Sequence, residues 1–128
     1  DHALARHGAV TLAQCATYPM IAPEQPLALA AMFTCLMEAG RIVPAVAARA
    51  NNVQMIISLV TTGIGICFLS SLDVMSEVAR GDLAFVPLVG TDMPHLTLAL
   101  VHDRTRQLSR LTHLVGTLMG DIMARHAI

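Results

Sequence analysis

The sequence has 128 residues, of which 55% are hydrophobic and 13% are charged, and its formal net charge is -1 at pH 7. A chain of this length fits one ordinary domain and can bury a core without disulfide or metal crosslinks. With so little net charge and only scattered arginines, the chain lacks the positive surface by which a domain holds nucleic acid, which argues against direct DNA binding by these residues.

The first elements expected along the chain are a helical turn, a strand and a helix. The turn falls in residues 9–16 and the strand in residues 18–22, which Pro23 ends. The helix is expected in residues 26–39, because proline suits the first position of a helix. Gly40 is expected to end that helix in a left-handed conformation, which glycine adopts at little cost.

A second strand and the clearest helix follow. The strand is expected in residues 45–50, after which Asn52 can cap a helix. Apolar residues recur there at the spacing i, i+3, i+4 and i+7, at Val53, Ile56, Ile57 and Val60. Gly63 closes the helix. The apolar run in residues 64–69 has the length of a strand that is covered on both faces.

The C-terminal half continues the alternation of helices and strands. A short helix is expected between Ser71 and Gly81, and strands are expected in residues 83–88 and 96–101. Ser109 can cap a long final helix with one broad apolar face. Strands that alternate with helices predict an α/β fold with an open, mostly parallel, Rossmann-like sheet flanked by helices.

The helix in residues 26–39 is more apolar than one sheet can cover. Between Leu27 and Ala39 only Thr34 and Glu38 are polar, and they stand four residues apart on one line. We therefore hypothesise that this helix contributes to an interface in a homo-oligomer; the alternative is that it packs entirely within one chain. The interface residues expected on it are Leu29, Met32, Phe33 and Leu36.

The stretch between Arg49 and Asp73 carries no charge, which raises the question of a membrane span. Asparagines and a glutamine interrupt one end, and Gly63 and Gly65 break the middle, so its apolar run falls short of the roughly 20 residues that a bilayer requires. No signal peptide is recognisable at the N-terminus. The three cysteines are odd in number and widely spaced, which suits a reducing compartment. We expect a cytoplasmic protein without a membrane segment.

No constellation for catalysis stands out. No two of the six histidines lie four residues apart on one expected helix, so we expect no metal site. Ser70 and Ser71 lack the glycine-flanked turn of a nucleophilic serine. Gly63 and Gly65 precede a strand, whereas a dinucleotide-binding turn follows a strand and begins a helix. We expect a protein that is not an enzyme and that carries no cofactor.

Binding chemistry is expected where strands end. In an open α/β sheet, ligands bind outside the carboxyl ends of the strands, beside the starts of helices. Two loops meet this condition, and their residues are Pro23, Glu24 and Gln25, and Asn51, Asn52 and Val53. Asn52 is either a plain helix cap or a ligand contact. Glu24 would repel an anion, so we expect it to serve a helix end or a cationic group.

Several motifs resemble the effector-binding region of LysR-type transcriptional regulators, from end to end. Residues 2–5 resemble the family's H-P-L-A, with alanine in place of proline. Residues 59–66 resemble V-x-x-G-x-G-I, which is the most specific stretch. Residues 81–88 match G-x-L and a strand that ends in P-L, and residues 107–109 resemble the start of the last helix. The main departure is Ser70, where the family usually has proline.

The resemblance implies two Rossmann-like subdomains, similar to type 2 periplasmic binding proteins, that enclose a small effector in a cleft. Residues 1–95 would form the second subdomain with the strand that leads into it, and residues 96–128 would return to the first. The helix-turn-helix domain and most of the first subdomain would lie outside this sequence. By carry-over, the two loops above would line one wall of the cleft. The family's dimer uses the helix in residues 26–39.

We therefore expect a sensor that binds a small-molecule effector, with a carboxylate as the favoured class, and that modulates DNA binding by the separate helix-turn-helix domain. Its partners would be further copies of itself, in a homodimer or homotetramer, and DNA only through the absent domain. A periplasmic solute-binding protein of the same fold is the alternative, and an α/β enzyme ranks third. One wall of a cleft buries little ligand surface, so this chain alone should bind an effector weakly or not at all.

Overall fold

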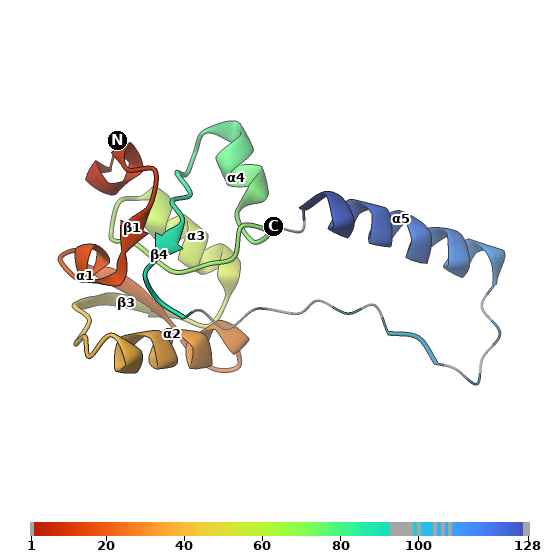
Figure 1. Cartoon of the computed structure of the whole chain (residues 1–128), viewed down its shortest axis with the longest axis horizontal. Helices are drawn as coiled ribbons and strands as arrows, with labels where there is room; N and C mark the ends of the chain where they lie inside the picture. Colours follow the sequence, from red (N-terminus) through yellow and green to blue (C-terminus); the bar gives the residue numbers. More distant parts are fainter. Residues whose placement is uncertain are drawn as a thin grey trace. The chain divides into compact units, whose positions relative to one another are not determined.

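Helices and strands alternate along the chain, as the spacing of apolar residues predicts (Figure 1). The computed structural model describes residues 2–92, 99, 101–103, 105, 107 and 109–126. The chain divides into two units, Asp1–Pro94 and His95–Ile128.

The strands of the first unit pair in parallel. Strand β2 (Met20–Pro23) runs beside β3 (Val46–Ala50), and β1 (Val10–Thr11) runs beside β4 (Leu88–Val89). Every strand pair among the described residues is parallel, including the isolated bridge from β2 to Ile66. This arrangement confirms the α/β class that the alternation of elements predicts.

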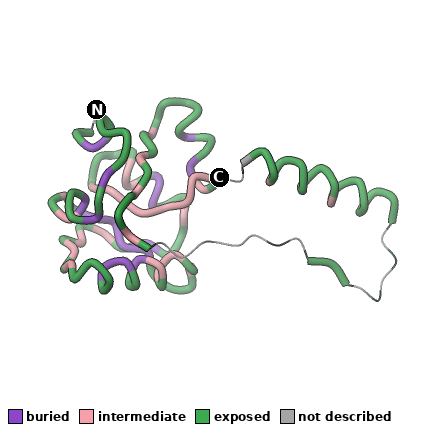
Figure 2. Tube along the Cα trace, in the orientation of Figure 1, coloured by how far each residue is buried: buried purple, intermediate pink, exposed green. Residues whose placement is uncertain are grey.

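Strand β2 contributes to the core through both of its faces. Met20 and Ala22 belong to a buried cluster with helix α2 (Ala28–Ala39), whereas Ile21 belongs to a second cluster with helix α3 (Val53–Thr61). Successive residues of a strand point to opposite faces of the sheet. Helices α2 and α3 therefore cover opposite faces of the β2 and β3 pair (Figure 1), and Figure 2 shows buried segments on β2 and on the inner side of α2.

Two predicted strands are shorter than expected. Of residues 64–69 only Ile66 bridges to β2, where its N–H donates to the Pro19 carbonyl at 2.9 Å and its carbonyl accepts from the Ile21 N–H at 2.8 Å. Of residues 83–88 only Leu88 lies in a strand. The continuous apolar run of residues 64–69 correctly predicted burial on two sides, since Phe68 packs against the α2 cluster and Cys67 against the α3 cluster. It did not predict that only Ile66 pairs with β2.

Helix α2 ends at Gly40 for a different reason from the one predicted. Gly40 has φ -78°, which is right-handed, and the left-handed residue is Arg41 with φ 50°. A Cβ on Gly40 would lie only 2.5 Å from Cδ2 of Leu12. The glycine therefore permits close packing against the short helix α1 (Leu12–Cys15). The helix also begins at Ala28 and not at Pro26.

Helix α4 (Met75–Arg80) begins later than predicted and ends as predicted. Gly81 closes it with φ 78°, a left-handed conformation. The turn before the helix is held by Asp73, whose Oδ2 accepts from the Ser70 hydroxyl at 2.7 Å and from the Ser70 N–H at 3.1 Å. At the position where the resembled family usually has proline, hydrogen bonds to a serine therefore hold the backbone.

The second unit contains helix α5 (Arg110–His126). The Ser109 hydroxyl accepts from the Thr112 N–H at 3.1 Å, which confirms the predicted cap. Most of the predicted strand in residues 96–101 lies outside the described residues. None of the helices in the described ranges has both the length and the apolar character needed to cross a bilayer.

Candidate functional site

The two loops singled out in the sequence come together at one edge of the sheet. Strand β2 ends at Pro23 and β3 ends at Ala50, and these two residues are partners in the register. The N–H of Glu24 donates to the carbonyl of Ala50 at 2.8 Å, so the ladder continues one residue beyond β2. Residues 23–25 and 51–53 thus emerge side by side at the carboxyl ends of two parallel strands, where α/β proteins bind ligands.

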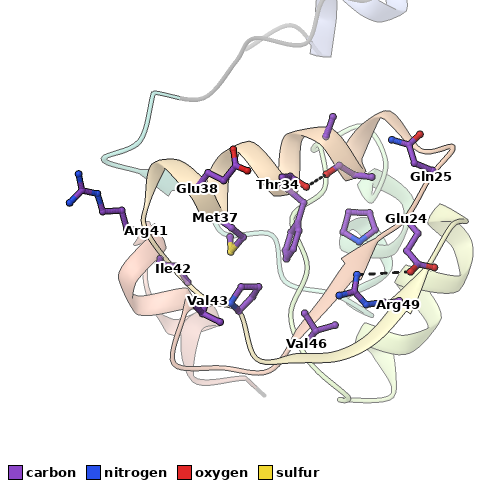
Figure 3. Close-up of a pocket in the computed structure, with 15 residues that line it drawn as sticks. Glu24, Gln25, Thr34, Met37, Glu38, Arg41, Ile42, Val43, Val46 and Arg49 are labelled. Carbon is purple, nitrogen blue, oxygen red and sulfur yellow. Dashed lines mark hydrogen bonds and ion pairs between the residues drawn. The ribbon is translucent and has the colours of Figure 1, made fainter.

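Two hollows open at this edge. The first has a volume of about 960 Å³ and lies between α2, β3 and the loops at their ends (Figure 3). Its lining comprises Pro23, Glu24, Gln25, Ala30, Ala31, Phe33, Thr34, Met37, Glu38, Arg41, Ile42, Val43, Pro44, Val46 and Arg49. The second has a volume of about 540 Å³ at the start of α3. Its lining comprises Glu24, Arg49, Ala50, Asn51, Asn52, Gln54, Met55 and Ser58.

Five of the six residues predicted for ligand binding line at least one hollow, and Val53 lines neither. Val53 is half-buried as the first residue of α3. Two residues, Glu24 and Arg49, line both hollows. Whether any of these residues contacts a ligand stays a prediction.

Arg49 is the site residue that the sequence analysis missed. Its NH1 atom lies 4.0 Å from Oε1 of Glu24, and the two side chains are 60% and 49% exposed (Figure 3). Glu24 was expected to serve either a helix end or a cationic group, and the structure pairs it with a cationic group. The available signal was position, because Arg49 is the second-to-last residue of the strand predicted in residues 45–50, which leads into the Asn51 loop.

Asn52 caps helix α3, as one of its two interpretations predicts. Its side-chain Oδ1 accepts from the N–H of Gln54 at 2.8 Å and from the N–H of Met55 at 3.2 Å. The cap satisfies amides that otherwise lack partners at the start of a helix. It also fixes the wall of the second hollow, since the residues that it binds line that hollow too.

Replacing Asn52 with alanine should lower the free energy of unfolding by about 1 kcal/mol, because both capping bonds are lost. Serine at this position can accept from the same amides, so Asn52→Ser should retain most of the stability. Urea denaturation of the three proteins measures the difference. An alanine variant as stable as the serine variant would contradict a capping role.

Two of the three cysteines, Cys15 and Cys67, are poor nucleophiles. Burial, and secondarily the negative charge of Asp73, raise the pKa of the Cys67 thiol to about 12. Burial also raises the pKa of Cys15. Both thiols are therefore protonated at neutral pH, whereas the thiolate is the reactive form. Among the residues that the structure describes, no three His, Cys, Asp or Glu side chains gather as metal ligands would.

The residues predicted for an oligomer interface on α2 divide into two groups. Phe33 and Leu36 are 7% and 3% exposed and lie in the core of their own chain. Met32 packs partly against the same core, and Leu29 is half-buried. The outward face of α2 carries small or polar residues, namely Ala28, Ala31, Thr34, Cys35 and Glu38. Leu29 and Met32 are thus the more exposed of the four predicted residues, and a contact between any of them and a second copy stays a prediction.

Comparisons with known proteins agree with the fold. The family described as "LysR substrate binding domain" matches residues 1–122. The chain is similar to a solved structure titled "Effector binding domain of QuiR in complex with shikimate", with a TM-score of 0.62 and 19% sequence identity. That match covers 74% of this chain and 43% of the other, so the chain spans less than half the length of that structure. At this identity the likeness shows the fold alone. No curated protein matches the chain.

Proposed function

This chain belongs to the LysR substrate binding domain family, and from this premise we propose that it senses a small-molecule effector for a LysR-type transcriptional regulator. One observation carries the proposal most directly. Two loops at the carboxyl ends of parallel strands open onto two hollows that share Glu24 and Arg49. The volumes of about 960 and 540 Å³ are those of sites for small molecules.

A carboxylate is the favoured class of effector. Arg49 lines both hollows, and a guanidinium binds a carboxylate through two parallel hydrogen bonds. Helix α3 begins at the second hollow, and the start of a helix favours negative charge. The similar solved structure is described in complex with shikimate, which is itself a carboxylate.

The chain would act on DNA only through other parts of the regulator. In this proposal residues 1–95 form the second subdomain, residues 96–128 return to the first, and a separate helix-turn-helix domain contacts the operator. The division of the chain between Pro94 and His95 supports this assignment. The effector would shift a cytoplasmic homodimer or homotetramer between two arrangements by its differential affinity for them, typically about 1 to 3 kcal/mol. No reaction is assigned to the site.

The test is a nuclear magnetic resonance titration of the ¹⁵N-labelled chain with a panel of small metabolites, both carboxylates and neutral compounds. We expect one compound class to shift the amides of residues 24–25 and 49–53, with affinity weaker than micromolar because one wall of a cleft buries little of a ligand. Shifts that map elsewhere for every compound, or chemical turnover of a bound compound, would contradict the proposal.

A further inference from the structure

We propose that the Glu24 carboxylate occupies the place of the effector's carboxylate on Arg49, and that binding exchanges one carboxylate for the other. This inference rests on the proposed function and names the pair of residues that selects the charge of the effector. It assigns Arg49 as the residue that recognises the effector's anionic group, and Glu24 as the competitor that the effector must displace.

The position of the pair singles out Arg49 among the cations of the site. Arg41 and Arg49 are the two arginines in the linings of the hollows, and Arg41 belongs to the first hollow only. Figure 3 shows Arg41 at the opposite end of that hollow from the Glu24 and Arg49 pair, with its side chain pointing outward. Arg49 is therefore the arginine that a ligand in either hollow can reach.

The contact between Glu24 and Arg49 is loose. Its 4.0 Å separation exceeds the roughly 2.7 to 2.9 Å of a charge-assisted hydrogen bond. Both side chains are about half exposed, so water screens their attraction and the pair contributes little to folding. A ligand carboxylate that makes two short hydrogen bonds to the guanidinium would therefore displace Glu24 at little cost.

Another arginine of the chain, Arg80, makes closer contacts with carboxylates than Arg49 does. Arg80 lies 2.8 Å from the carboxylate of Asp82 and 3.2 Å from that of Glu77. Glu77 is buried, and its N-terminal neighbour Ser76 donates a hydrogen bond to it at 2.8 Å. Arg80 is thus committed to two carboxylates within the fold, whereas Arg49 has one loosely held partner beside two hollows.

The exchange requires only side-chain rotation. Arg49 lies in β3 in register with Ala22, and the backbone of Glu24 is bound to the carbonyl of Ala50. The sheet therefore holds both backbones in place while the exposed carboxylate of Glu24 swings away. Because the backbone stays fixed, neutral variants of either residue should fold like the natural chain.

The experiment compares cyclohexanecarboxylate with its uncharged analogue cyclohexanecarboxamide, each titrated into the labelled chain at constant ionic strength. Glu24→Gln removes the competitor, so the carboxylate should bind about threefold more tightly. Arg49→Gln removes the guanidinium, so the carboxylate should bind about tenfold more weakly. The carboxamide should respond to neither change by more than about twofold.

Two control variants carry the same changes of charge at residues of the first unit that line neither hollow. Arg6→Gln and Asp92→Asn change exposed side chains, so they should leave both probes unaffected. A decrease in carboxylate affinity in Glu24→Gln, or equal effects on both probes, would overturn the exchange while the proposed function stands. The exchange would also be overturned if the carboxylate shifted no amide of residues 49–53 in any variant. The proposed function would then still be tested separately, by the titration with the metabolite panel.

Discussion

Replacement of Ile21 with alanine is expected to lower the free energy of unfolding by about 3 kcal/mol. Ile21 lies in β2 with 0% of its surface exposed, in the cluster that it forms with Ala50 and Ile56 under helix α3. Truncation removes buried apolar surface and leaves a cavity that close-packed neighbours fill only in part. Urea denaturation should show a lower midpoint with an unchanged slope, since the surface exposed on unfolding changes little.

Val43 provides the matched control for Ile21. It is also β-branched, but it is 95% exposed in the loop before β3. Val43→Ala should change stability by less than about 0.5 kcal/mol. If the two alanine variants were equally stable, helix α3 would not cover the face of β2 that carries Ile21, and the layered arrangement described above would be wrong.

Local patterns predicted the elements that depend on local interactions. Helix α3 is the clearest example, because its cap at Asn52 and its apolar spacing both lie within one stretch of sequence. Residues 64–69 show the opposite case. Their apolar character comes from burial on two sides, but pairing with β2 depends on hydrogen bonds to Pro19 and Ile21, which are remote in sequence.

The candidate site was also predicted only in part. The loops at residues 23–25 and 51–53 were identified because parallel strands end at a common edge. Arg49 was missed because its pairing with Glu24 follows from the register of β2 and β3, which no local pattern reveals. The burial of Phe33 and Leu36 likewise depends on residues of α1 and β2 that are remote in sequence and that could not be inferred from the helix alone.

The second large effect is expected at Gly65, the second glycine of the V-x-x-G-x-G-I motif. Gly65→Ala should lower the free energy of unfolding by about 3 kcal/mol, at the upper end of the usual cost of overpacking. A Cβ at this position would lie 2.5 Å from the carbonyl oxygen of Pro19. That oxygen accepts the hydrogen bond from the N–H of Ile66, so alanine would push apart the backbones that this bond joins.

Gly63, the first glycine of the motif, is the control for Gly65. It tests whether alanine is harmful at Gly65 because of a steric clash or only because glycine is generally preferred in this motif. It has φ 78° and open space around its Cβ position, so Gly63→Ala should cost only about 1 kcal/mol from the strain of a left-handed residue. Asparagine tolerates that conformation better, so Gly63→Asn should recover part of the loss, whereas Gly65→Asn should be at least as harmful as Gly65→Ala. Thermal and urea denaturation of the four variants would measure this order. A smaller loss at Gly65 than at Gly63 would mean that residues 64–66 do not approach the start of β2 as closely as described.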